Sequence, residues 1–458
     1  MENYFSRRKF IGTVGATAAL TILGGGFESC KKPLIYVRQN VKNLAANSLT
    51  MVTYNAAVKA MRLLPPTDPL SWSYQAAIHG TDDMTMPMPA GWNSCQHHNY
   101  YFWSWHRMYL YYFEKIIRKM SGNISWALPY WDWTTDMQLP APFRDTSSEL
   151  YTANRSPTIN DGTASLSPLD VSYSTAFAYT DFFNASDWLQ YSPHGAVHID
   201  IGGWMLRVPT AAQDPIFFLH HCNIDRLWNL WLAQGGRYDP LDDNDWKTHP
   251  FTFFDENRNP VVMTGCEILN ATIQLGYSYE GEPKEVRQDC FKVPPIIRLQ
   301  RERIFHFPIP PIILGSEPQT LNLDIRGIKE RLSTLTKTAS NTILLELANV
   351  EADKQPGAVW EVYVGTLPQN ADRSPKNPNL LGTISLFGVG IRSETHHEFQ
   401  AASFRFPVNK ALLQLLQANG DTLTISLIPH GNVINGQLTI PKIESPLKIG
   451  EVNLLLEK

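Results

Sequence analysis

The chain has 458 residues, of which 43% are hydrophobic and 18% are charged, and its formal net charge is −4 at pH 7. This composition excludes a disordered chain and is typical of a globular protein with more than one core. The balanced charge offers no basic surface for nucleic acid and no acidic block for cationic partners, so we expect a small ligand. The oligomeric state stays open.

The chain begins with a pattern typical of an export signal. Arg7 and Arg8 are followed by Phe10 and a mildly apolar stretch to Gly26, which predicts a twin-arginine signal peptide over residues 1–30. The stretch is too short and too rich in Gly and Thr to span a bilayer. We therefore expect export in folded form, to the periplasm or to the cell envelope.

Cys30 follows this stretch in a loose lipoprotein-type cleavage site. Two outcomes stay open, ordinary cleavage nearby or lipidation of Cys30, and a lipid anchor is the only membrane attachment that we expect.

A first group of histidines lies in an aromatic stretch. His106 begins an amphipathic run that predicts a helix to about Met120. His97 precedes it by nine residues, half a turn out of phase on a continuous helix, so we expect His97 on a loop. His79 is the natural third member. Because neutral imidazole binds copper, zinc, iron and nickel, residue type alone leaves the metal open.

A second group begins with His194 and His198, which are four residues apart and would share one face of a helix. Two groups of histidines indicate two metal positions. A zinc hydrolase is the rival interpretation, but no Glu lies between these histidines to act as a base, as it does in the metalloprotease pattern.

The second group continues in a predicted helix that starts at Asp214 and runs to about Gln234. His220 and His221 both lie in it. Asp225 follows His221 by four residues, so we expect its carboxylate to orient that imidazole.

The remainder of the chain has a different pattern. Residues 293–320 are rich in proline, which predicts an extended linker. Alternating runs at 342–347, 359–364 and 422–427 predict an all-β sandwich or barrel over 321–458. The expected fold class is therefore a mainly α domain over 35–292, followed by the linker and the β domain.

Taken together, these motifs are similar to the signatures of the tyrosinase, catechol oxidase and haemocyanin family. The matching segments, in order along the chain, are 103–110, 128–133, 194–198 and 214–228. Segments at 245–246, 251–257 and 275–279 resemble the part that follows the copper domain in plant-type polyphenol oxidases, and the last domain resembles their C-terminal domain.

The resemblance implies a helical bundle with two copper ions that dioxygen or hydroxide bridges. It assigns three ligands to each copper: His79, His97 and His106 to one, and His194, His198 and His221 to the other. It implies an oxidase that converts small o-diphenols to o-quinones and reduces O2 to water. The alternatives are a full tyrosinase that also hydroxylates monophenols and a haemocyanin-like oxygen-binding protein.

Three residues are expected to modulate the pocket. Phe217 matches a family position beside the substrate ring, although core packing is an equal alternative. Family members that hydroxylate monophenols usually have Glu where this chain has Gln190, and often Asn where it has Gly195. Because Gln cannot ionise, we expect oxidation of o-diphenols or o-aminophenols over hydroxylation of tyrosine.

The five cysteines are too few and too scattered for a disulfide scaffold. The resemblance implies a thioether between Cys95 and His97, with a buried thiol as the alternative. Cys222 is expected to pack within its helix, and Cys266 and Cys290 either pair or stay reduced.

The resemblance also implies a role for the C-terminal domain. It would cover the copper pocket, insert a plug side chain and keep the enzyme latent until proteolysis or detergent displaces it. The sequence does not identify the plug residue, and a plain accessory domain is the alternative.

Overall fold

A computed structural model of the chain describes residues 35–283, 285–294, 298–367, 372–392 and 399–458. The predicted signal peptide and Cys30 lie outside these ranges. In the part that is described, no helix is long and apolar enough to cross a membrane. We call residues 35–294 the helical region and residues 298–458 the β region.

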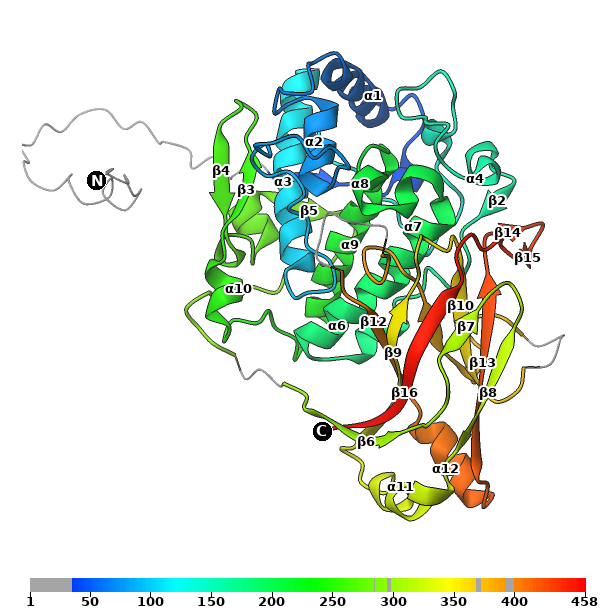
Figure 1. Cartoon of the computed structure of the whole chain (residues 1–458). Helices are drawn as coiled ribbons and strands as arrows, with labels where there is room; N and C mark the ends of the chain where they lie inside the picture. The colour runs from blue at the N-terminus through cyan, green and yellow to red at the C-terminus, as the bar shows by residue number, and fades with distance from the viewer. Residues whose placement is uncertain (1–34, 284, 295–297, 368–371, 393–398) are drawn as a thin grey trace, which may run out of the picture. The chain divides into compact units, whose positions relative to one another are not determined.

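Ten α-helices occur among the described residues of the helical region: α1 (Leu49–Arg62), α2 (Trp72–His79), α3 (Phe102–Ser121), α4 (Pro157–Asp161), α5 (Ser174–Ala178), α6 (Phe182–Leu189), α7 (Ala196–Ile201), α8 (Val208–Ala211), α9 (Ile216–Ala233) and α10 (Asn244–Thr248). Helix α3 packs against α1 and α9, which together form the centre of this region (Figure 1). Helix α9 is buried on nearly every side from Ile216 to Leu232, which is typical of a helix inside a core.

Two helix predictions can be compared directly with the structure. The helix predicted from His106 begins four residues earlier, at Phe102, because Phe102, Trp103 and Trp105 are buried and extend the apolar face. Gly122 ends this helix in the left-handed conformation, with φ of 71°, which glycine adopts without strain. The helix predicted over 214–234 is α9.

Short strands also occur in the helical region: β1 (Tyr36–Arg38), β2 (Ala164–Ser165), β3 (Phe251–Phe254), β4 (Pro260–Met263) and β5 (Tyr277–Tyr279). Strand β1 pairs in parallel with β5. This pairing places Arg38 beside Tyr277 and Tyr279, and the guanidinium of Arg38 also binds Asp225 in the middle of α9.

The β region contains the strands β6 (Arg301–His306), β7 (Ile312–Leu314), β8 (Gln319–Asp324), β9 (Thr342–Glu351), β10 (Val359–Val364), β11 (Leu380–Ile384), β12 (Ala402–Pro407), β13 (Thr422–His430), β14 (Val433–Ile434), β15 (Gln437–Leu438) and β16 (Leu447–Glu457). Two antiparallel sheets form, with the orders β11-β10-β13-β8 and β12-β9-β16-β6, and their apolar side chains share one core. Helices α11 (Lys329–Leu335) and α12 (Asn409–Gln417) lie together at one end (Figure 1).

The predicted fold class agrees with this architecture, a helical core followed by a region rich in β-strands. The interpretation of 293–320 as a linker is wrong in part, because β6 and β7 lie within it and pair with β16. The prolines at 308, 310 and 311 fall between the two strands, where no ladder hydrogen bond is lost.

A third sheet joins the two regions. Strand β14 pairs antiparallel with β2 of the helical region on one side and with β15 on the other. A hairpin of the β region therefore adds to a strand of the helical region.

Candidate metal centre

The elements described above bring two groups of histidines together. His79 is the last residue of α2, His97 lies on the loop before α3, and His106 lies in the first turns of α3. Gly80 allows α2 to approach the next segment, because a Cβ there would lie 2.7 Å from the carbonyl oxygen of Val208. The sequence predicts this loop position, because His97 would lie on the opposite face from His106 on a continuous helix.

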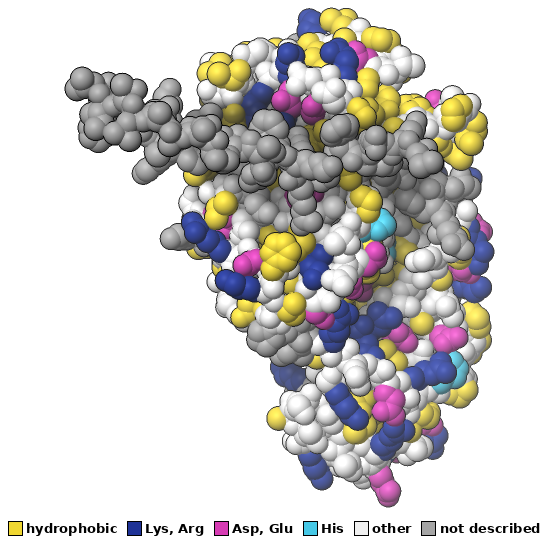
Figure 2. Space-filling view, turned by 90° about the vertical axis from the view of Figure 1, so that its left-hand side faces the viewer, with side chains coloured by type: hydrophobic (Ala, Val, Ile, Leu, Met, Phe, Trp, Pro, Cys, Tyr) yellow, Lys and Arg dark blue, Asp and Glu magenta, His cyan; other side chains and the backbone are white. Residues whose placement is uncertain are grey.

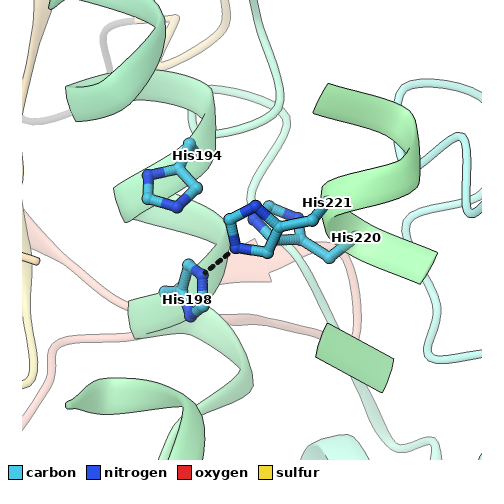
Figure 3. Close-up of side chains that lie close together, drawn as sticks. All are labelled: His194, His198, His220 and His221. Carbon is cyan, nitrogen blue, oxygen red and sulfur yellow. Dashed lines mark hydrogen bonds between the residues drawn. The ribbon is translucent and has the colours of Figure 1, made fainter. Parts of the chain in front are cut away.

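The second group comes from two helical segments. The chain turns through a π-helical stretch from Gln190 to Gly195, with a kink at Ser192, and continues as α7. His194 and His198 therefore lie on consecutive helical turns, and α9 supplies His221 from the opposite side (Figure 3).

The rings of each group lie close to one another. In the first group, the ring centroids of His79 and His97 are 5.3 Å apart, and that of His106 lies 5.3 Å from His97 and 5.8 Å from His79. In the second group, the centroid of His194 lies 4.8 Å from His198 and 5.0 Å from His221. The groups adjoin, because the rings of His106 and His221 are stacked at 4.3 Å.

These side chains are inside the protein. Among the described residues visible on the face in Figure 2, histidine occupies only small patches, whereas His79, His194, His198 and His221 are 0% exposed. Burial lowers the pKa of His106 to about 3. Burial and the neighbouring imidazoles also hold the pKa of His194 well below its usual value. The imidazoles are therefore neutral at pH 7, as metal coordination requires.

The hydrogen bonds of the imidazole rings determine which ring nitrogen carries the proton. The other nitrogen is then the one that could bind a metal. Four Nδ1 atoms face backbone carbonyl oxygens, at 3.1 Å for His79, 2.8 Å for His106, 3.0 Å for His194 and 2.9 Å for His198. Because a carbonyl oxygen only accepts, each Nδ1 carries the proton and each Nε2 keeps its lone pair. The Nε2 atoms of His97, His106 and His194 are buried with no hydrogen-bond partner among the described residues. This arrangement fits metal binding.

The same reasoning separates the two adjacent histidines of α9. Distance alone groups both His220 and His221 with His194 and His198. Trp133 Nε1–H donates to His220 Nδ1 at 3.1 Å, so a neutral His220 carries its proton on Nε2 and has no lone pair there for a metal. The Nε2 of His221 lies 3.3 Å from the Nε2 of His198 (Figure 3). The geometry therefore favours His221, the residue chosen from the sequence.

The expected pairing of His221 with Asp225 is wrong. Within the described part of the chain the Nδ1 of His221 has no hydrogen-bond partner. The carboxylate of Asp225 instead accepts hydrogen bonds from two arginines and two tyrosines: Arg38, Arg107, Tyr277 and Tyr279. Burial acts to raise the pKa of Asp225, but Arg107 and Arg38 hold it below its usual value. Its role is to anchor α9 to α3 and to the β1–β5 pair.

Cys95 and Phe217 both contact the histidines. The Sγ of Cys95, which is buried, lies 3.5 Å from the Nδ1 of His97. The ring of Phe217 lies 4.7 Å from that of His79 and 4.2 Å from that of His221, centroid to centroid. Phe217 is fully buried, so it forms a wall of the centre that touches both groups.

Gln190 links two parts of the centre. Its side-chain oxygen accepts a short hydrogen bond from the backbone N–H of His98, and its Nε2 donates to the carbonyl oxygens of Ser186 at 3.3 Å and Asn99 at 3.4 Å. The side chain therefore ties the loop that carries His97 to the segment that carries His194.

The structure identifies a residue that the sequence did not. The ring of Phe387, from the β region, stacks on the ring of His198 at 3.8 Å and 10°, and its centroid lies 5.4 Å from His194 and 5.7 Å from His97. We call residues Ser385–Gly388 the cover segment. Gly195 lies against this segment, because a Cβ there would be 2.9 Å from Ser385 Oγ and 3.2 Å from Phe387 Cβ.

A buried ion pair also connects the two regions. The Nε2 of His430, on β13, lies 2.7 Å from a carboxylate oxygen of Asp170, and its Nδ1 lies 3.1 Å from Glu361; all three side chains are 0% exposed. Burial acts to lower the pKa of His430, but the two carboxylates raise it to about 10. His430 is therefore protonated at pH 7.

Six neutral imidazoles in two adjoining groups define a candidate dinuclear metal centre. Comparison with known proteins gives the family. The common central domain of tyrosinase matches residues 69–182 and 152–234, and the polyphenol oxidase middle domain matches residues 240–288. A domain of unknown function (DUF7868) matches residues 316–444.

Full-length relatives agree with these matches. A tyrosinase of Hahella sp. is 31% identical, over 86% of this chain and 95% of its own length. A chloroplastic polyphenol oxidase of Malus domestica is 25% identical, over 82% of this chain and 72% of its own. The chain belongs to the tyrosinase and polyphenol oxidase family, and it is an oxidoreductase with a dinuclear copper centre.

Solved structures share the fold across both regions. Latent apple tyrosinase covers 93% of this chain and 98% of its own, with a TM-score of 0.63 at 22% identity. Latent aurone synthase, a polyphenol oxidase, covers 95% of this chain and 92% of its own, with a TM-score of 0.63 at 21% identity.

Proposed function

We propose that the chain is a latent o-diphenol oxidase that converts o-diphenols to o-quinones and reduces O2 to water. The observation that carries the proposal is the stacking of Phe387 on His198 within a centre of six imidazoles, five of which are buried. An aromatic ring at this position is parallel to a ligand ring, as a phenol would be. When bound, the copper pair supplies the binding of dioxygen and the transfer of electrons from the phenol.

The residues of this chain have separate tasks in the reaction. His79, His97 and His106 would hold one copper, and His194, His198 and His221 would hold the other. In four of these residues, namely His79, His106, His194 and His198, an Nδ1–H bond to a backbone carbonyl keeps the ring oriented. The side chains of Phe217 and Phe102 surround the rings and exclude bulk water from the centre.

The preference for o-diphenols over monophenols rests on Gln190. An amide side chain cannot ionise, so it cannot accept the proton of a phenol. The hydrogen bonds of Gln190 go to backbone groups of His98, Asn99 and Ser186, so the side chain is committed to holding the two loops. An o-diphenol, which enters the reaction already hydroxylated, needs no such base at this position.

We propose latency because the β region covers the centre. Phe387 occupies the position where a substrate ring would stack, and the docked region is held by β14, by the ion pair of His430 with Asp170, and by the packing of Phe406 on Trp188. Access for a phenol requires this contact to open.

We also propose a thioether between Cys95 and His97. The Sγ of Cys95 is already 3.5 Å from the imidazole of His97, so the bond needs little movement. Formation of the C–S bond removes the thiol hydrogen of Cys95 and one ring C–H hydrogen of His97, and dioxygen would take up these two electrons and two protons. The peptide that contains both residues would therefore be two hydrogen atoms lighter than its sequence predicts and would resist alkylation by iodoacetamide. An unchanged mass in copper-loaded protein would contradict this proposal.

The test of the function is oxygen uptake by the copper-loaded full chain, with 4-methylcatechol and tyrosine as separate substrates, before and after opening by dodecyl sulfate below its micelle concentration. We expect little uptake before opening, uptake with 4-methylcatechol after opening, and none with tyrosine. Uptake with tyrosine would contradict the preference for o-diphenols, and full uptake without detergent would contradict latency.

The chain is further proposed to leave the cytoplasm by the twin-arginine route, on the pattern around Arg7 and Arg8. Replacement of both arginines by lysine would retain the protein in the cytoplasm. Cell fractionation measures this, and secretion of the double variant would contradict the route.

A further inference from the structure

The cover segment contacts the metal centre and its surroundings through its main chain as well as through the side chain of Phe387. While the ring of Phe387 stacks on His198, its main-chain carbonyl oxygen accepts a hydrogen bond from His98 Nε2–H at 3.0 Å. The hydroxyl of Ser385 donates to the carbonyl oxygen of Tyr191 at 2.5 Å. The helical region therefore contacts both the aromatic ring and the chain that carries it.

His98 is held ready for this contact by other groups of the helical region. Its backbone N–H donates to the side-chain oxygen of Gln190, and its ring packs on that of Tyr191 at 4.5 Å, centroid to centroid. It is not one of the six metal ligands chosen above. A hydrogen-bond donor beside the ring site would have no acceptor on a phenol that carries no substituent. It does match the carbonyl oxygen of an amide attached to the ring.

The centre also has room for a chain attached to the ring. Gly195 leaves the space in which Ser385 and Phe387 pass, since a Cβ there would approach Ser385 Oγ to 2.9 Å. Beyond the ring, a cavity of about 290 Å³ follows the chain at Gly388 and Val389. The helical region lines it with polar side chains, namely Gln96, His98 and Asn99.

We propose that the substrates of the opened enzyme are o-diphenols attached to a peptide chain, such as 3,4-dihydroxyphenylalanine within a polypeptide. This inference rests on the o-diphenol oxidase function proposed above. The catechol ring would take the place of the Phe387 ring, and His98 Nε2–H would donate to the carbonyl of the same residue. His98 and Gly195 are then specificity-determining residues, and the cover segment imitates the substrate.

The reaction itself balances as for any o-diphenol. Each catechol loses two electrons and its two hydroxyl protons and becomes an o-quinone, while the peptide bond is unchanged. Dioxygen receives the four electrons and four protons of two such rings and is released as two molecules of water.

The test compares two substrates of the copper-loaded full chain, opened with dodecyl sulfate as above. One is 4-methylcatechol, and the other is the peptide Ser-Leu-Xaa-Gly-Val-Gly, which copies residues 385–390, the cover segment and the two residues after it, with 3,4-dihydroxyphenylalanine as Xaa. We expect kcat/KM for the peptide to be about tenfold higher or more. The variant His98→Phe keeps the ring that packs on Tyr191 but removes the donor, and we expect it to lower the ratio of the two kcat/KM values about tenfold.

A matched control is His249→Phe, a change at a partly exposed histidine of the helical region, which should leave the ratio as it is in the parent protein. A peptide advantage that His98→Phe removes supports the inference. Equal kcat/KM for the two substrates, or an equal loss on both in His98→Phe, would overturn the inference and leave the oxidase function standing. If a chain with two coppers oxidises neither substrate, the oxidase function fails and the inference falls with it.

Discussion

Phe387 and His198 lie face to face, with ring centroids 3.8 Å apart and planes inclined by 10°, although 189 positions separate them in the sequence. His198 lies on α7, and Phe387 lies on the loop after β11. The contact joins the metal centre to the region that covers it, so the two parts are expected to respond together when either is changed.

The first prediction concerns this contact. Phe387→Ala in the full chain removes the ring that occupies the substrate position, so we expect the uptake of oxygen with 4-methylcatechol, measured without detergent, to rise at least tenfold. Phe399→Ala, at a partly exposed phenylalanine of the same region, is the control and should stay latent. Since truncation of a buried Phe costs about 3–5 kcal/mol, urea unfolding must show that the variant is folded. A folded Phe387→Ala protein that remains inactive would contradict the role of this ring.

The second prediction separates the two adjacent histidines of α9. We expect His221→Ala to lose one of its two coppers, because it removes a ligand, and His220→Ala to retain both, because its Nδ1 is already committed to Trp133. Copper per chain, measured by atomic absorption after dialysis, decides between them. The reverse result would show that the tautomer assigned to His220 is wrong.

The third prediction concerns Gln190. Gln190→Glu removes the donor to the carbonyl oxygens of Ser186 and Asn99 and places a carboxylate in a site that is 1% exposed. We expect a loss of about 1–3 kcal/mol in the free energy of unfolding, measured with urea. Gln414→Glu, at an exposed position on α12, should change it by less than about 0.5 kcal/mol. Unchanged stability in Gln190→Glu would mean that this side chain does not tie the two loops.

The fourth prediction is a pH dependence of the contact between the regions. The pKa of His430 is raised to about 10 from an ordinary value of 6.5, so protonated His430 stabilises the docked state fully below about pH 6.5 and this contribution is lost as the pH rises through about 10. The groups that face it are Asp170, Glu361 and Asp200, and Arg373 neutralises Glu361 from the other side.

We therefore expect oxygen uptake without detergent to increase between pH 8 and 10.5, relative to the detergent-opened protein at the same pH. His430→Gln should already be partly open at pH 7 and should lack this rise. His306→Gln, at a histidine on β6 that lies in the same region, is the control. A parent protein that stays equally latent at pH 10.5 would contradict the role of the ion pair.

Much of the centre is predictable from the sequence because its spacings have a direct geometric meaning. The spacing of four positions from His194 to His198 places both rings on one side of a helical segment, even though a π-helical turn precedes α7. The phase between His97 and His106 excludes a common helix, and His97 is indeed on a loop. Helix α3 begins four residues before the start that the sequence predicts, because the aromatic residues before His106 bury their side chains in the core.

Other features depend on tertiary contacts that no local pattern carries. Asp225 lies four positions after His221, which is the spacing of a hydrogen-bond partner on a helix. Its carboxylate instead binds two arginines, from β1 and α3, because a charged donor attracts it more strongly than a neutral imidazole. Phe387 is one of 21 phenylalanines, and only the docking of the β region distinguishes it. The sequence indicates Gly195 as a determinant of substrate choice, and in the fold the absence of a side chain there also leaves space for the cover segment.

The most direct test of the central claim is the stoichiometry of oxygen consumption by the opened, copper-loaded chain with 4-methylcatechol. The account predicts two coppers per chain and one dioxygen consumed for every two molecules of o-quinone formed. It also predicts that His198→Ala loses one of the two coppers and the activity. A chain that binds two coppers, is fully opened and forms no quinone would contradict it.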